Sequence, residues 1–118
     1  YQRSRGLGDV YKRQAQIKAF HHVALHGGFS VAAGALGLSQ PALSEQVRQL
    51  EMRYDLLFFR RQNRRVELTD RGRDLFQLTS RFFENESAIA SFLDGASARL
   101  RGSLRIMVDS TAHATGPL

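Results

Sequence analysis

The side chains best suited to molecular recognition lie close together between Ser39 and Arg65. The run QPALSEQVRQLE, from Gln40 to Glu51, combines amide, hydroxyl, carboxylate and guanidinium groups, and all of these can hydrogen-bond the edges of nucleic-acid bases. The run RRQNRR, which ends at Arg65, contains four arginines and no acid, as expected of a surface that binds phosphate. Both runs indicate recognition through hydrogen bonds and charge.

Catalytic and metal-binding patterns do not stand out in the sequence. We find no arrangement of nucleophile, base and acid, and no glycine-rich phosphate loop. The lack of cysteine excludes disulfides and thiolate zinc sites. His22 and His26 have a spacing that can bind a metal on a helix, but no third ligand accompanies them. We interpret them as surface or packing residues, and we expect no enzyme, cofactor or metal site.

The charge favours an acidic partner, because the chain carries +6 with a pI of about 10.7. Residues 1–14 hold four basic residues and one acid, so they contribute +3, half of the net positive charge. They show neither helical nor strand periodicity and resemble translated sequencing-adapter sequence. We therefore expect residues 1–14 to be a non-native or disordered leader; the alternative is a basic arm that adds phosphate contacts. No apolar run approaches the ~18 residues that span a bilayer, so no membrane partner is expected.

Three helices are predicted to position the polar run. The first covers Ala15 to His26, and the second is short, with Ser30 as its N-cap. The third runs from about Gln40 to Tyr54 and is capped by Ser39. Its apolar residues recur at helical spacing and form one narrow stripe, made of Leu43, Val47, Leu50 and Tyr54. The opposite face of this helix is left free for contacts.

A β-hairpin with a basic tip is predicted after the third helix. The apolar run from Leu56 to Phe59 and the alternation of Val66 and Leu68 are typical of two strands, with Asn63 suited to the turn between them. Thr69 is predicted to cap the next helix.

A long helix is predicted from about Asp70 to Ala98. Apolar residues recur along it at heptad-like spacing, which is typical of a dimerisation seam. The seam residues are Leu75, Leu78, Phe82, Asn85, Ile89, Phe92 and Ala96. The polar residue among them, Asn85, either fixes the register of the dimer or faces water where the seam is imperfect.

After the long helix, the last residues of the chain are predicted to form a strand. Arg101 and Gly102 are predicted to end the long helix, and Leu104, Ile106 and Val108 alternate as a half-buried strand does. A lone strand forms no stable sheet, so we expect residues 101–118 to be the truncated start of another domain.

These motifs, in this order, resemble the N-terminal part of a LysR-type transcriptional regulator. The matching stretches are AFHHVALHGGFSVAAGALGLSQPALSEQVRQLE, LFFRR, VELTDRG and GSLRI. The resemblance implies a mainly α fold with a winged helix-turn-helix over residues 15–72, a dimerising linker helix over 73–100, and the start of an α/β effector-binding domain over 101–118. AFHHVALHGGFS and GSLRIMVDS also resemble a subset associated with phosphonate-utilisation operons.

The resemblance also assigns roles to residues. It implies base contacts at the start of the third helix, by Gln40, Pro41 and Ser44, and Arg48 lies on the same face. At the position after Ser44, where the family often has arginine, this chain has Glu45, which could accept from a cytosine amine. Arg61 matches an arginine of the family, whereas Arg60 stands where the family often has glutamate. From the charge of the hairpin, phosphate contacts are expected for Ser39, Arg60, Arg61, Arg64 and Arg65. Ser110 and Thr111 match a region where the family often binds an anionic effector group, and the alternative is that they are ordinary turn hydroxyls.

The sequence thus predicts a bacterial, cytoplasmic, nucleoid-associated regulator that binds double-stranded DNA as a homodimer or tetramer. A small-molecule effector is expected for the full-length protein. The alternative is a winged-helix module that binds protein and not DNA. The salt dependence of binding distinguishes these two functions. Phosphate contacts displace counterions from DNA, so affinity for DNA falls steeply as the salt concentration rises.

Overall fold

The computed structural model describes the backbone of residues 2–62 and 65–115, and the side chains of residues 6–62 and 65–102. The chain divides into two compact units, Tyr1–Arg81 and Phe82–Leu118. Each unit is described by itself.

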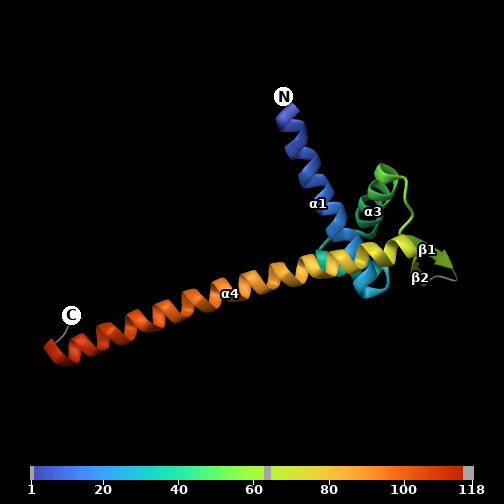
Figure 1. The fold of residues 1–118 in the computed structure, drawn as a ribbon. Coiled ribbons are helices and arrows are strands. Elements are labelled where there is room, and N and C mark those ends of the chain that lie inside the picture. Colours follow the sequence, from blue (N-terminus) through green and yellow to red (C-terminus); the bar gives the residue numbers. More distant parts are fainter. Residues whose placement is uncertain (1, 63–64, 116–118) are drawn as a thin grey trace. The chain divides into compact units, whose positions relative to one another are not determined.

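The chain is mainly helical, with one small hairpin (Figure 1). Its elements, in chain order, are α1 (Gln2–His26), α2 (Phe29–Leu36), α3 (Gln40–Tyr54), β1 (Phe59–Gln62), β2 (Arg65–Leu68) and α4 (Asp70–Thr115). Three helices, a two-stranded wing and a long helix confirm the predicted winged helix-turn-helix fold.

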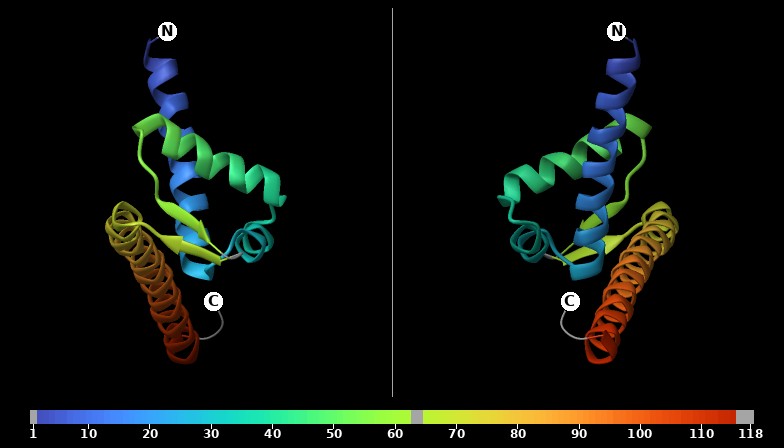
Figure 2. Two further views of the ribbon diagram at one scale, coloured as in Figure 1. Left: turned by 90° about the vertical axis from the view of Figure 1, so that its right-hand side faces the viewer. Right: turned by 90° about the vertical axis from the view of Figure 1, so that its left-hand side faces the viewer.

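The core of the first unit lies where α1 packs against both α2 and α3, and α1 and α3 cross in both views of Figure 2. It is built from small and branched aliphatic side chains and one aromatic ring, namely Ala19, Val23, Phe29, Ala32, Ala33, Leu43 and Val47. Of the predicted α3 stripe, Leu50 is buried as well, but Tyr54 is 43% exposed. Tyr54 is the last residue of α3, and the chain turns away at Asp55, whose φ is +53°. The stripe is therefore one residue shorter than predicted.

The predicted cap of α2 was wrong. The helix begins at Phe29, and Gly28 is its N-cap without a side-chain hydrogen bond. Phe29 is only 7% exposed, so burying its ring favours a helix that starts one residue before Ser30. The Ser30 hydroxyl instead donates to Oε1 of Gln40 at 3.1 Å.

The hairpin is joined to α1 by an aromatic cluster. The Phe20 ring lies 5.3 Å from that of Phe58 and 5.2 Å from that of Phe59, measured between centroids. The strands pair antiparallel from Phe59↔Leu68 to Gln62↔Arg65. Residues 56–58 were expected in the first strand but precede it, and the predicted turn residue Asn63 lies outside the described part of the chain.

Thr69 caps α4 as predicted. Its Oγ1 accepts from the Gly72 amide at 3.0 Å and donates to the Leu57 carbonyl at 2.5 Å. The same hydroxyl therefore starts α4 and ties it to the segment before β1. Ser39 likewise caps α3, because its Oγ accepts from the Ala42 amide at 3.2 Å.

The two ends of the chain differ from the expectation. Residues 2–14 are the first part of α1 and not an irregular leader. Extending an existing helix adds one hydrogen bond for each residue that it orders, and no proline interrupts this stretch. At the other end, the predicted strand over 104–108 is part of α4, which continues past Gly102 to Thr115. A helix pairs its backbone groups internally, whereas a single strand leaves them unpaired.

Candidate nucleic-acid interface

The outer face of α3 presents the predicted base-facing residues. Gln40, Pro41 and Arg48 are exposed, and Ser44 and Glu45 are half-buried. The buried stripe on the opposite side of α3 holds the helix against α1 and leaves this polar face outward. The structure therefore presents all five residues on an accessible surface.

A groove runs between α3 and the wing, and its walls come from both elements. Its lining includes Pro41, Ser44, Glu45 and Arg48 of α3 and Arg61 of β1. Gln40 lines a neighbouring hollow together with Ser30, Arg61 and Arg65. Arg61 belongs to both depressions, so it joins the base-facing residues to the basic wing.

The predicted phosphate-binding residues are distributed over the hairpin and the start of α3. Arg60, Arg61 and Arg65 are all exposed. Arg60 lies opposite Glu67 in the strand register, on the other face of β1 from Arg61, because successive strand residues alternate faces. Arg64 lies outside the described residues. The Ser39 hydroxyl is exposed but already accepts the hydrogen bond that caps α3.

The position of Arg61 depends on Phe29, a residue that is not among the predicted site residues. The Arg61 guanidinium carbon lies 4.7 Å from the centre of the Phe29 ring, within cation–π distance. Phe29 begins α2, more than thirty residues earlier in the chain, so no local spacing pointed to this contact. The aromatic ring orients the arginine at the junction of the two depressions.

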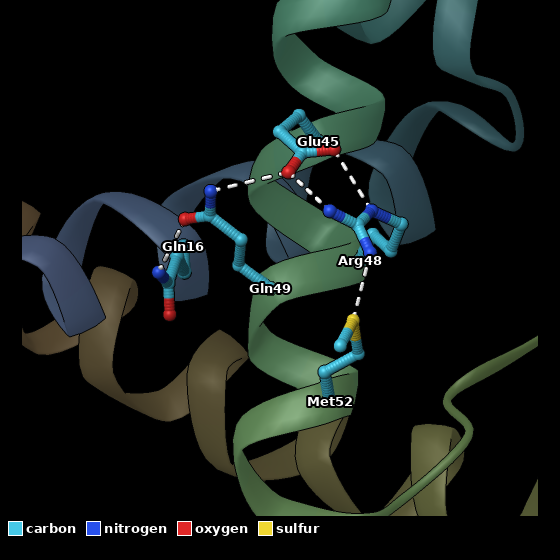
Figure 3. Close-up of polar contacts among 5 residues, drawn as sticks. All are labelled: Gln16, Glu45, Arg48, Gln49 and Met52. Carbon is cyan, nitrogen blue, oxygen red and sulfur yellow. Dashed lines mark hydrogen bonds and ion pairs between the residues drawn. The ribbon is translucent and has the colours of Figure 1, made fainter.

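Glu45 and Arg48 form an ion pair along α3 (Figure 3). Arg48 Nε donates to Oε2 of Glu45 at 2.8 Å, and Arg48 Nη2 donates to Oε1 at 2.5 Å. These bonds lower the pKa of the Glu45 carboxyl and raise that of Arg48. From the sequence, Glu45 is expected to be a free acceptor, although its i,i+3 spacing to Arg48 is a visible signal for this pair.

The ion pair is part of a longer set of contacts. Gln49 Nε2 donates to Oε1 of Glu45 at 3.2 Å, and Gln16 Nε2 of α1 donates to Oε1 of Gln49 at 3.2 Å. On the other side, Arg48 Nη1 lies 2.8 Å from the sulfur of Met52 (Figure 3). Neither Gln16 nor Gln49 had been assigned a role.

A histidine cluster lies between α1 and the start of α4, within the first unit. His21 Nδ1 and Thr79 Oγ1 are 2.9 Å apart, and the His21 ring lies 5.4 Å from that of Phe76. Burial is the largest cause that lowers the pKa of both His21 and His22, and neighbouring histidines add to it. The rings of His22 and His26 stack at 5.7 Å. Within the described ranges, no three His, Asp or Glu side chains gather as metal ligands would.

The predicted dimerisation residues divide between the two units. Leu75 packs against the aromatic cluster of the first unit, where Leu78 is 60% exposed. In the second unit Phe82, Ile89 and Phe92 are each at least 55% exposed in the single chain. Asn85 is exposed and Ala96 is half-buried. The side chains of Ser110 and Thr111, the predicted effector residues, lie outside the described part of the structure.

The fold and this surface define a winged helix-turn-helix protein, and comparison with known proteins identifies its family. Residues 14–73 match the family described as bacterial regulatory helix-turn-helix proteins, lysR family. The chain belongs to this family. It is 39% identical over 102 residues to the RuBisCO operon transcriptional regulator of Allochromatium vinosum, with 86% of this chain and 34% of that protein covered.

A second relative is the HTH-type transcriptional regulator PtxR of Pseudomonas aeruginosa. It is 41% identical over 90 residues, which cover 76% of this chain and 29% of PtxR. The chain thus spans about a third of the length of these relatives. Their descriptions as transcriptional regulators agree with the expectation that the chain is not an enzyme. The resemblance to a phosphonate-associated subset is not confirmed by these comparisons.

Solved structures with a similar fold include complexes with DNA. The BenM DNA-binding domain bound to the catB site 1 DNA has a TM-score of 0.62 and 26% identity, covering 70% of this chain and 92% of that one. The CbnR DNA-binding domain in complex with DNA has a TM-score of 0.58 and 29% identity, covering 70% and 94%. No helix in the described part of our chain has the length and apolar character that crossing a membrane requires.

Proposed function

We propose that this chain is the DNA-binding part of a transcriptional regulator and recognises specific double-stranded DNA sequences. The observation that carries the proposal is the groove that joins the polar face of α3 to Arg61 of the wing. Membership of the lysR family supports it, as do similar folds solved in complex with DNA.

Recognition follows from the two kinds of side chain in this surface. An α-helix fits the major groove of B-DNA, so α3 would present Gln40 and Ser44 to base edges. An amide can donate to and accept from adenine at the same time, which makes adenine the natural partner of Gln40. The wing arginines Arg61 and Arg65 would contact flanking phosphates, which contribute affinity but little sequence information.

Self-association is proposed through α4. Large apolar side chains that are more than half exposed on one chain, such as Ile89 and Phe92, are stabilised when a second copy covers them. Their heptad-like spacing suits a helix–helix interface. Two copies would place two α3 helices on a DNA site with two-fold symmetry.

The longer protein is proposed to respond to a small-molecule effector and to act in the bacterial cytoplasm, at the nucleoid. Both proposals rest on membership of the lysR family. The chain itself does not carry them, because it spans only about a third of its relatives' length. Ser110 and Thr111 remain candidates for contact with an anionic group of that effector.

A binding experiment tests the DNA proposal. The chain is incubated with a pool of random duplexes, bound DNA is enriched, and affinities for the enriched and a random duplex are measured across salt concentrations. Gln40→Ala should cost about 1–3 kcal/mol on the enriched duplex and little on the random one. Arg65→Ala should weaken binding to both duplexes and reduce the salt slope by about one.

The matched control is Arg99→Ala, which removes the same charge from an exposed position of the second unit. It should leave the preference for the enriched duplex intact. If the wild-type chain enriches no sequence and its binding does not depend on salt, the alternative of a protein-binding winged helix is favoured.

A further inference from the structure

The Glu45 carboxylate is already engaged on the surface that would face DNA. One oxygen accepts from Arg48 Nε, and the other accepts from Arg48 Nη2 and Gln49 Nε2 (Figure 3). A cytosine amine would have to compete with these three donors. Glu45 is therefore poorly placed to read a base directly.

Arg48 is held by the same contacts. A guanidinium has five N–H groups, and three of those of Arg48 point to Glu45 and Met52. The other two have no hydrogen-bond partner among the described residues, and the side chain is 57% exposed at the edge of the groove. A guanidinium oriented in this way can donate to a guanine edge, which offers two acceptors, O6 and N7.

The pair is anchored to the core of the first unit. Gln49 holds Glu45 from one side and accepts from Gln16, which is only 4% exposed on α1. Gln16 is fixed by the packing of α1, so this chain of contacts restricts the Glu45 carboxylate and, through it, the Arg48 guanidinium.

The ion pair with Glu45 also changes how Arg48 can contribute to DNA affinity. A free guanidinium binds any phosphate and so raises affinity for every sequence. With a carboxylate bonded to two of its nitrogens, the pair has no net charge, and long-range attraction to phosphate is largely cancelled. What remains is the short-range hydrogen bonding of the outward donors, which depends on the base in front of them.

We propose that Glu45 is a positioning residue that orients Arg48 and cancels its charge, so that Arg48 reads a base edge, with guanine as the preferred partner. This inference rests on the proposed DNA-binding function. It replaces the sequence-based idea that Glu45 itself accepts a hydrogen bond from cytosine.

Three variants of the 118-residue chain separate charge from positioning. Glu45→Gln makes the pair positive, Arg48→Gln makes it negative, and the double variant is neutral like the wild type. Each is put through the same enrichment from random duplexes, and its affinity for one random duplex is measured against salt. Thermal melting checks that all four proteins fold, as expected for side chains that are about half exposed.

Glu45→Gln should bind random DNA more tightly, with a salt slope steeper by about 0.9, because one more cation meets phosphate. Its enriched sequences should lose the guanine preference at one position of each half-site, a loss of about 5- to 150-fold in discrimination. The double variant should recover the wild-type salt slope but not that preference. Arg48→Gln should lose the preference as well.

The outcomes are separable. If Glu45→Gln enriches the same sequences as the wild type, the inference is wrong, whatever its salt slope. If Arg48→Gln keeps a cytosine preference that Glu45→Gln loses, Glu45 reads the base itself and the inference is also wrong. A wild-type chain that enriches no sequence overturns the proposed function, whereas unchanged variants beside a sequence-specific wild type overturn only the role of Glu45.

Discussion

Gly72 lies where α4 leaves the hairpin, and there is no room for a side chain at this position. A Cβ atom would lie 2.1 Å from the Phe58 carbonyl oxygen and 3.0 Å from Cδ2 of Leu68. The carbonyl is not free to move, because it accepts from the Thr69 amide at 3.0 Å. Gly72→Ala should therefore lower the free energy of unfolding by about 1–3 kcal/mol, measured by urea denaturation.

The matched control is a glycine without neighbours. Gly34 lies inside α2, and nothing is within 4 Å of the position of its Cβ. Gly34→Ala should raise the free energy of unfolding by about 0.5–1 kcal/mol, since alanine restricts the unfolded chain and favours helix. Equal effects of the two substitutions would contradict the close approach at Gly72.

At the scale of elements, Glu51 of α3 holds the start of the wing. Its carboxylate accepts from the amide of Phe58 at 2.7 Å and, less closely, from that of Phe59 at 3.4 Å. Glu51→Ala should lower the free energy of unfolding by about 1–3 kcal/mol, because the part-buried amides lose a charged acceptor. Glu67→Ala, an exposed carboxylate on β2, should change it by less than about 0.5 kcal/mol. Similar losses in the two variants would argue against this role of Glu51.

The contact between α1 and α4 in the first unit should depend on pH. His21 faces Thr79 and Phe76 of α4, with His22, His26 and Lys18 nearby on α1. Because the pKa values of His21 and His22 are lowered on folding, the unfolded chain binds protons at a higher pH than the folded chain does. Stability should therefore be full above the unfolded-state pKa of about 6.5 and fall as the pH drops below it.

Melting temperatures between pH 7.5 and 5.5 measure this dependence. The double variant His21→Gln/His22→Gln should show a flatter profile than the wild type over this range. If the two profiles run parallel, the histidines do not account for the pH dependence.

At the scale of the whole molecule, α4 should mediate self-association. The wild-type chain should show a concentration-dependent dimer in analytical ultracentrifugation. Ile89→Glu should raise its dissociation constant at least about tenfold, because a charge would be buried in the apolar seam. Ser87→Glu adds the same charge two residues away, at an exposed position outside the heptad pattern, and should leave the dimer intact. Loss of association in both variants would point to charge repulsion instead of a seam.

The amino-acid sequence alone was sufficient to predict the three helices, the wing, the caps at Ser39 and Thr69, and the family. These features depend on local signals, namely helical spacing, capping side chains and ordered motifs, which are readable without contacts from distant residues. The ion pair of Glu45 and Arg48 was also within reach of the sequence, because its spacing on a helix is local. The roles of the individual base-facing and phosphate-facing residues stay predictions.

Contacts between distant segments were decided only by the tertiary structure. Arg61 lies over Phe29, Gln16 anchors Gln49, and Gly72 passes the Phe58 carbonyl, and each pair joins different elements. The continuation of α4 to Thr115 was likewise decided by the tertiary structure. Alternating apolar residues form a strand only where a neighbouring strand can pair with them. Sequence periodicity shows which face of an element is apolar, but the packing of elements determines which side chains meet.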